Sequence, residues 1–277
     1  MLITIIGRVL RMLDLLRRVG MNLRSIGLGL AAVSLFAFGA AAHAAPVNST
    51  GNVTPGVIYG SGNANGAFTG EAQNNIEVGL RAHQRYPAAN IFNYDGINTY
   101  VFDSTVLTTN PSNRSVFNFD WSINVGSTGL FLDDFSYVLS YDTDASSNTV
   151  YASFDPFAGP GYFDHALGTS STTAGTAVVA SNISELILNM ATNTVAQQST
   201  NLGFGTNLGV PLSADPDAPG IYNFKLEVFA LNTSDLLASS EITVRVNPVP
   251  VPGALPLLAS GIGVFGLMWR RRRRGAD

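Results

Sequence analysis

Cysteine is absent from the 277 residues, lysine occurs once, and histidine occurs three times. Without cysteine the chain can form neither a disulfide nor a thiolate site, so its core depends on packing and hydrogen bonds alone. The sequence also lacks the H-E-x-x-H, G-x-S-x-G and phosphate-loop patterns, which excludes the most easily recognised zinc, hydrolase and nucleotide sites. No catalytic activity can therefore be assigned from a standard motif of this sequence.

Positive charge is scarce outside the two ends of the chain. Of the 15 basic residues, five lie between Arg8 and Arg24 and five form the run Arg270–Arg274. Of the 19 acidic residues, only Asp14 and Asp277 lie outside the part between these ends. This central part therefore has five basic and 17 acidic residues, a net charge of −12. Such an acidic body argues against binding to nucleic acid or to anionic lipid.

The last 30 residues combine a proline-spaced segment, an apolar stretch and an arginine run. Gly253–Trp269 carries no charge and, as a helix of 17 residues, would span about 26 Å of the roughly 30 Å hydrocarbon core. Each arginine costs about 2.5–3.5 kcal/mol at mid-bilayer, so Arg270, Arg271, Arg272, Arg273 and Arg274 should stay cytoplasmic. A membrane stop signal is therefore predicted, with a buried core helix and a nucleic-acid role for the arginines as alternatives.

The tail resembles a known class of bacterial sorting signals. Val249-Pro250-Val251-Pro252, the glycine-rich apolar segment and the terminal arginines resemble PEP-CTERM signals, in particular the VPLPA-CTERM variant. Val251 departs from the usual Glu or Leu of that family. The resemblance implies that an exosortase-type membrane protease cleaves near the motif and releases or transfers the body at the cell surface. It covers only about the last 30 residues.

The N-terminus has the three parts of a secretory signal peptide. Met21-Asn22-Leu23-Arg24 precedes the apolar run Ile26–Ala42, and Ala42-His43-Ala44 fits an A-x-A cleavage site, so Ala45 is the expected mature start. The first 20 residues do not fit a standard leader, which leaves Met1 and Met21 as alternative starts. A retained N-terminal transmembrane anchor is the other interpretation.

These signals divide the chain into a signal peptide (1–44), a body (45–247) and a C-terminal sorting signal (248–277). The body is long enough for one domain with a full core. It is rich in Asn, Ser, Thr and Gly, a composition typical of β-sheets and turns rather than helices.

Strict alternation of apolar and polar residues predicts strands in the body. Ser115–Val125 is the clearest, and each such strand should bury its apolar face and leave its polar face in water. Trp121 lies on the aromatic face and is expected in the core. The pattern also occurs at Ile76–Ala82, Tyr100–Leu107, Phe135–Tyr141, Thr149–Phe154, Tyr222–Val228 and Ile242–Val246.

Many short strands separated by turns predict an all-β fold with two packed antiparallel sheets. We expect a jelly-roll or immunoglobulin-like sandwich, with a barrel as the alternative. For Ser181–Ala191 the sequence allows either a strand or one short helix. Asn182 and Glu185 resemble a capping box, which is the argument for the helix. Val47–Gly70 is expected to be loosely ordered near its start.

Two groups of side chains invite a chemical interpretation. Asp164-His165 with a serine would suggest a triad, but adjacent strand residues point to opposite faces, which favours a surface or hydrogen-bonded histidine.

The second group, Asp142, Asp144, Ser146 and Asn148, has the 1-3-5-7 spacing of calcium ligands. It lacks the glycine at position 6 and the glutamate at position 12, which favours an ordinary hairpin loop. We therefore assign no catalytic residue, no metal and no cofactor, and keep calcium as the alternative.

Three functions fit these observations. The first is a non-enzymatic exported protein that the tail anchors in the inner membrane before processing, and that then reaches the cell surface or extracellular matrix. The second is a carbohydrate-binding module that stacks sugars on Tyr94, Tyr151 or Trp121. The third is a polysaccharide-active enzyme with an unrecognised carboxylate pair. Expected partners are the secretion machinery, the exosortase-type protease, the membrane and, for the last two functions, extracellular polysaccharide; nucleic acid is not expected.

Overall fold

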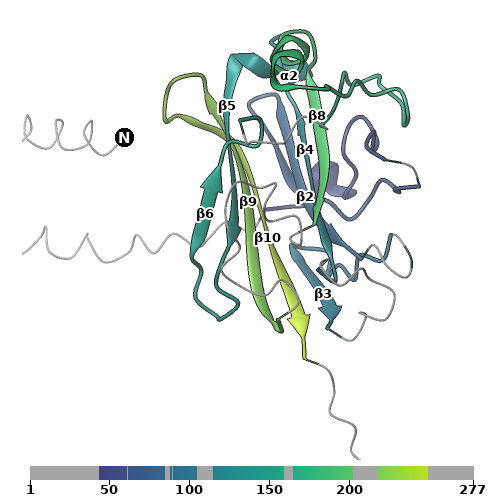
Figure 1. Cartoon of the computed structure of the whole chain (residues 1–277), viewed down its shortest axis with the longest axis vertical. Coiled ribbons are helices and arrows are strands. Elements are labelled where there is room, and N and C mark those ends of the chain that lie inside the picture. The colour runs from purple at the N-terminus through teal and green to yellow at the C-terminus, as the bar shows by residue number, and fades with distance from the viewer. Residues whose placement is uncertain are drawn as a thin grey trace, which may run out of the picture. The chain divides into compact units, whose positions relative to one another are not determined.

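The computed structural model describes residues 44–60, 62–84, 88, 90–104, 115–158, 165–201 and 218–248. In these ranges the chain consists mostly of β-strands arranged in two five-stranded sheets (Figure 1). The predicted membrane helix Gly253–Trp269 lies outside the described residues. Within them, no helix combines the length and the apolar character that a membrane crossing requires.

Sheet I has the strand order β1-β2-β4-β8-β7, and all neighbours in it are antiparallel. Sheet II has the order β3-β10-β9-β5-β6, antiparallel except for the parallel pair β3–β10. The prediction of two mainly antiparallel sheets is confirmed. The strands of sheet I are β1 (Thr69–Gln73), β2 (Ile76–His83), β4 (Asn118–Asn124), β7 (Ala166–Gly168) and β8 (Val195–Asn201). Those of sheet II are β3 (Thr99–Asp103), β5 (Phe135–Asp142), β6 (Tyr151–Phe154), β9 (Gly220–Ala230) and β10 (Leu236–Asn247).

The main core lies between the two sheets and is rich in aromatic rings. Phe119 of β4 stacks on Phe224 of β9 with ring centroids 4.7 Å apart. Trp121 is fully buried, as predicted, and meets Phe157 edge to face at 5.8 Å. Each such pair contributes about 0.5–1.5 kcal/mol beyond the area it buries. The alternating aromatic pattern of the sequence thus holds the two sheets together.

A segment that precedes the first strand covers the outer face of sheet I. We name residues 45–68 the strap; it begins with a 3-10 turn, η2 (Val47–Ser49). A second apolar cluster lies between the strap and the sheet. Gly79 of β2 leaves room for it, because a Cβ atom there would lie 3.0 Å from Val53 Cγ1. The expectation that this segment starts loosely ordered is wrong, since its apolar side chains pack against the sheet. The buried strap residues are Val47, Val53, Val57, Ile58, Tyr59 and Phe68.

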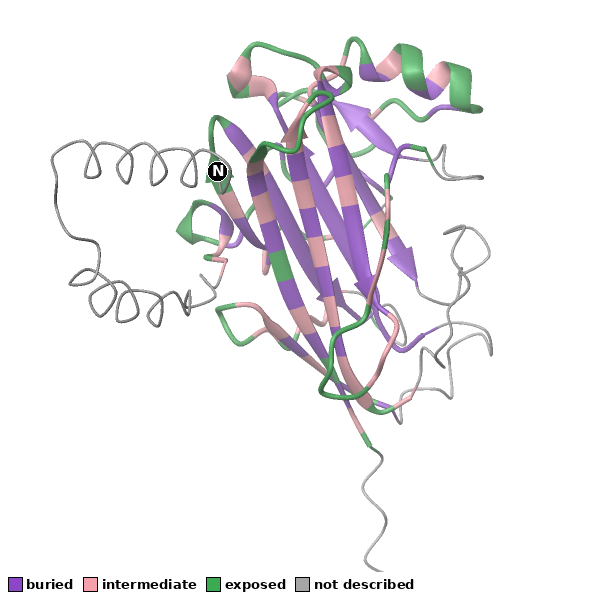
Figure 2. Cartoon of the chain, turned by 90° about the vertical axis from the view of Figure 1, so that its left-hand side faces the viewer, coloured by how far each residue is buried: buried purple, intermediate pink, exposed green. Residues whose placement is uncertain are grey.

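The outer faces of the two sheets differ in exposure. Along β9 and β10 in sheet II, buried residues alternate with intermediate or exposed ones, which gives the striped strands of Figure 2. In sheet I every residue of β4 is buried, including Asn118 and Asp120 on its polar side. The prediction that the polar side of this strand is wet is therefore wrong, because the strap covers it.

The ambiguous segment 181–191 contains a helix, α2 (Ile183–Met190). The Asn182 side chain accepts a hydrogen bond from Glu185 N (3.0 Å), and the Glu185 carboxylate accepts one from Ser181 N (2.8 Å). An N-cap of this kind contributes about 1 kcal/mol, which selects the helix over a strand. The link from β4 to β5 carries two 3-10 turns, η4 (Gly126–Thr128) and η5 (Leu132–Asp134).

Candidate functional site

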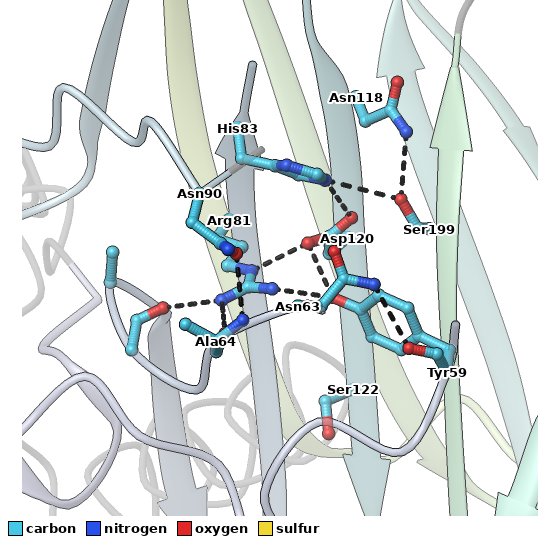
Figure 3. A network of polar contacts seen from close by, with 12 residues as sticks. Tyr59, Asn63, Ala64, Arg81, His83, Asn90, Asn118, Asp120, Ser122 and Ser199 are labelled. Carbon is cyan, nitrogen blue, oxygen red and sulfur yellow. Dashed lines mark hydrogen bonds and ion pairs between the residues drawn. The ribbon is translucent and has the colours of Figure 1, made fainter. Parts of the chain in front are cut away.

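A group of buried polar side chains lies between sheet I and the strap (Figure 3). Strand register creates it, because Arg81 of β2 is paired with Asp120 of β4, which in turn is paired with Ser199 of β8. All three residues lie on the outer face, opposite the aromatic core. His83, two residues after Arg81, shares that face. Strands β2 and β4 thus bring one cation, one carboxylate and one imidazole together, with Ser199 of β8 paired to Asp120.

Asp120 is the centre of this charge network. Its Oδ2 accepts a hydrogen bond from Arg81 Nε at 2.7 Å, and its Oδ1 lies 3.1 Å from His83 Nε2. The side chains of Arg81 and Asp120 are both 0% exposed. A buried pair of opposite charges survives only when its remaining hydrogen-bonding groups are also satisfied.

The strap supplies those remaining partners. The Tyr59 hydroxyl donates to Asp120 Oδ2 at 2.6 Å and accepts from Arg81 Nη2 at 2.9 Å. Arg81 Nη1 donates to the carbonyl oxygens of Ala64 (2.7 Å) and Gly66 (2.9 Å). Four of the five guanidinium N–H groups can therefore be accounted for within the network. The charge network joins the strap to two strands of the sheet.

Aromatic rings enclose the guanidinium group. The Arg81 Cζ atom lies 4.3 Å from the centroid of the Phe68 ring and 4.8 Å from that of Phe92. A cation over an aromatic face gains about 0.5–2 kcal/mol, with the larger values in desolvated sites such as this one. The rings therefore offset part of the desolvation cost and exclude water from the ion pair.

The neighbours of Asp120 keep it ionised. Burial alone would raise the pKa of its carboxyl group, but His83 and Arg81 outweigh burial and hold that pKa well below its usual range. Burial and the adjacent Asp120 raise the pKa of Tyr59 well above its usual value, so the phenol remains a hydrogen-bond donor. Desolvation opposes the charge on Arg81, but Asp120 raises the pKa of the guanidinium overall. Asp120 and Arg81 are thus both charged at neutral pH, and Tyr59 is neutral.

This arrangement is suited to holding the strap in place rather than to proton transfer. A general acid or base must come within hydrogen-bond reach of a substrate, directly or through one water molecule. Here the strap lies over the carboxylate, and Tyr59 and Arg81 occupy its Oδ2. We interpret the charge network as a structural clamp between the strap and sheet I.

The predicted Asp164–His165 pair is only half described, because Asp164 lies outside the described residues. His165 is buried and lies edge to face against Trp121 and Phe157, each with ring centroids 5.2 Å away. Its Nε2 is 2.6 Å from the carbonyl oxygen of Pro156, and since a carbonyl oxygen can only accept, the imidazole donates. His165 is therefore a hydrogen-bonded core residue, one of the two environments that the sequence favoured.

The residues with calcium-like spacing bind their own loop. Asp142 Oδ1 accepts from the backbone N–H groups of Asp144 (3.1 Å) and Val150 (2.9 Å). The Asp144 carboxylate accepts from both the N–H and the hydroxyl of Ser146, each at 2.9 Å, and the Ser146 hydroxyl accepts from Asn148 N. These are the bonds of successive turns in which Asp and Ser side chains cap the backbone. In the described part of the chain, no three His, Cys, Asp or Glu side chains cluster as metal ligands would.

The aromatic residues considered for sugar stacking already have partners within the protein. Tyr94 stacks on Tyr100 with a centroid distance of 4.8 Å. Tyr151 donates to Glu241 Oε1 at 3.1 Å, and Lys225 Nζ lies 5.6 Å from the centre of its ring. Trp121 is in the core, as stated above. Tyr94 and Tyr151 thus contact other side chains of the body, and Trp121 fills part of the core.

Most of the predicted sorting residues fall outside the described ranges. Ala42, the motif Val249–Pro252 and the arginines 270–274 are not described. Ala44 and Ala45 are, and the Ala45 carbonyl oxygen accepts a hydrogen bond from Gly70 N at 2.9 Å. The residue expected to start the mature chain is thus the first one tied to sheet I in the described ranges.

Sequence reasoning missed the charge network, although one signal for it was present. Arg81 and Asp120 each stand in the middle of a strand whose other face is apolar. Charged residues at such positions are solvated if the face is open and must be paired if it is covered. Only the register of β2 against β4 and the course of the strap decide between these cases. No family model, no curated protein and no solved structure matches the chain with significant similarity.

Proposed function

We propose that this chain is an exported, non-catalytic cell-surface or extracellular-matrix protein that an exosortase-type protease processes at its C-terminus. The observation that carries the proposal is the tail itself: Val249–Pro252, then an uncharged segment, then five arginines. A membrane span that ends in a basic run fixes the direction of insertion. The body would then lie on the far side of the membrane from Arg270–Arg274.

The ends of the folded body support processing at both predicted positions. Strand β10 ends at Asn247, two residues before the motif, and lies between β3 and β9 in sheet II. Cleavage at the motif would therefore leave the sheet intact. At the other end, cleavage after Ala44 would keep the bond between the Ala45 carbonyl and Gly70 N. Both cuts would spare the paired strands.

The strand order supports the immunoglobulin-like form of the sandwich over the jelly roll. Immunoglobulin-type domains have strands A-B-E-D in one sheet and G-F-C in the other. If the strands β2, β4, β5, β7, β8, β9 and β10 are lettered A to G along the chain, β2-β4-β8-β7 in sheet I reads A-B-E-D, and β10-β9-β5 in sheet II reads G-F-C. Folds of this kind serve many unrelated functions, so the correspondence carries no activity with it.

The interior of the body supports a role without catalysis. In the clamp around Asp120, the carboxylate is enclosed by the strap. The proposal does not extend to a carbohydrate ligand, because the rings of Tyr94 and Tyr151 contact other side chains of the same chain.

Fractionation of cells that express matched proline variants tests the proposal. Changing Pro250 and Pro252 to alanine removes the motif, whereas Pro256→Ala changes the same residue type four positions later in the apolar segment. We expect the double variant to stay in the membrane fraction at full length, and Pro256→Ala to be processed like the natural chain. Identical fractionation of the natural chain and the double variant would contradict processing at this motif.

A further inference from the structure

Large exposed apolar side chains concentrate at one end of the sandwich. Among the described residues, 11 large apolar side chains are at least 40% exposed, and nine of them lie in segments 130–131, 178–188 and 231–236. We name these three segments the apolar end. The other two residues, Ile97 and Val150, lie elsewhere. Single exposed apolar residues are ordinary on protein surfaces, but a concentration of this kind marks an interaction site.

Three connections between strands meet at the apolar end. The β4–β5 link contacts the segment after α2, since Leu132 N donates to Asn193 O at 3.1 Å and Val125 N to Thr194 O at 2.8 Å. The β9–β10 turn adjoins the same link, because Phe135 at the start of β5 is paired with Ala230 at the end of β9. The exposed residues are thus distant in sequence and are gathered by the fold, with α2 at the top of the view in Figure 1.

Helix α2 is apolar on two sides. Leu186 and Met190 are buried against the body, while Ile187 and Leu188 are 58% and 71% exposed. Ile183 and Ile187 are four residues apart and share one exposed face. A surface helix that only covers a core needs a single apolar stripe. The second stripe has no partner among the described residues.

The charged residues within the connections of the apolar end all have one sign. Asp133, Asp134, Glu185 and Asp235 belong to its connections, and residues 125–135, 169–194 and 229–237, all of them described, contain no lysine or arginine. Like charges oppose pairing of this end with the same end of a second copy, and they oppose contact with anionic lipid. They complement an apolar surface rimmed by lysine or arginine.

We propose that the apolar end docks a partner protein through an amphipathic, basic surface of that partner, such as a cationic helix. Apolar side chains of the partner would pack on Ile183, Ile187 and Leu188, and its cations would face the carboxylates. Strand β10 starts at this end with Leu236 and runs 12 residues to Asn247, about 40 Å away. The docking end and Asn247 therefore lie at opposite ends of β10.

Photo-crosslinking with a defined probe tests this assignment. The probe is a 14-residue helical peptide of leucine and lysine with one photoreactive leucine; a leucine–glutamate peptide is its charge-reversed counterpart. The full-length chain in neutral detergent is the target. Ile187→Ser removes an exposed apolar side chain from the docking end, and Ile97→Ser is the matched control, with 58% and 53% exposure respectively.

We expect crosslinks of the lysine peptide to map to segments 130–131, 178–188 and 231–236. Their yield should fall at least fivefold in Ile187→Ser and stay within twofold in Ile97→Ser. Crosslinks that spread over other surfaces, or equal capture of the glutamate peptide, would overturn the proposal. Self-association that Ile187→Ser abolishes in sedimentation would assign this end to a second copy. Flotation with vesicles of anionic lipid that the same variant abolishes would assign it to a membrane. Either result would also overturn the proposal that a basic partner protein binds at this end.

Discussion

The outer faces of the two sheets have similar sequence patterns but different surroundings. Both alternate apolar residues toward the core with polar residues away from it. In sheet II the outward residues Lys225 and Glu227 form an ion pair at 3.0 Å, with side chains 29% and 17% exposed. In sheet I the outward residues Arg81 and Asp120 form one at 2.7 Å with no exposure. Alternation tells which residues face the core, whereas a separate segment decides whether the other face meets water.

The difference matters energetically because burial changes what an ion pair contributes. A pair near the surface is screened by water and contributes about 0–1 kcal/mol. A buried pair has little net value, but removal of one partner leaves an uncompensated charge and costs about 3–5 kcal/mol. The same chemical pairing thus has different consequences on the two faces.

The largest effect is expected from Arg81→Met. Methionine keeps much of the side-chain volume between Phe68 and Phe92 but leaves the buried Asp120 carboxylate without its guanidinium partner. We expect the free energy of unfolding to fall by about 3–5 kcal/mol, measured by chemical denaturation. Addition of Asp120→Asn to this variant should recover part of the loss, because it removes the uncompensated charge.

Lys225→Met in sheet II is the matched control for that change. Its partner Glu227 remains partly solvated, so the expected loss is below about 1 kcal/mol. Equal losses for Arg81→Met and Lys225→Met would show that the two faces do not differ in the way described.

An intermediate effect is expected from Tyr59→Phe. The substitution keeps the ring but removes the hydroxyl that donates to Asp120 and accepts from Arg81. Loss of a hydrogen bond to a charged group costs about 1.5–3 kcal/mol. Since Tyr59 belongs to the strap, amide hydrogen exchange should accelerate in residues 45–68 more than in β9 or β10. Unchanged exchange in the strap would contradict its attachment through the charge network.

The smallest and most gradual effect concerns pH. Because the pKa of Asp120 is depressed in the folded protein, its contribution is complete above the unfolded value of about 3.9 and is lost as the pH falls below it. Glu77 and Asp155, whose pKa values burial raises, act in the opposite direction. We therefore expect the stability difference between the natural chain and Asp120→Asn to stay constant from pH 6 to about pH 4 and to shrink as the pH falls further, as urea unfolding at each pH would measure. A difference that stayed constant below about pH 4 as well would contradict a depressed pKa.

The sequence predicted the strands with alternating apolar residues, aliphatic as in β2 and β10 or aromatic as in β4, but not the strands without such alternation. Strand β8 was missed because its core-facing residues are Ala196, Gln198 and Thr200, which give no apolar period. The strap was misjudged because its valines and Tyr59 follow no fixed spacing, so local pattern says nothing about the surface on which they pack.

For the candidate site, the sequence showed which residue types are present but not that the fold places their side chains in contact. Arg81 and Asp120 are 39 positions apart, and Tyr59 is 61 positions from Asp120. Such contacts depend on strand register and on tertiary packing, neither of which a period of two can specify. The expectation for His165 was closer, because a hydrogen-bonded histidine was one of the two environments favoured, and its Nε2 bonds the Pro156 carbonyl oxygen.

The parallel pairing of β3 with β10 has a consequence for the order of folding. Asp103 and Asn247, hydrogen-bonded at the end of this pair, are 144 positions apart. A chain that emerges from a ribosome or a secretion channel with its N-terminus first must keep β3 without this neighbour until nearly the whole body has appeared. Contacts of such long range form slowly. Completion of the second sheet and arrival of the proline motif are then almost simultaneous, so under the proposed function the motif would become available for processing only when the body is able to close.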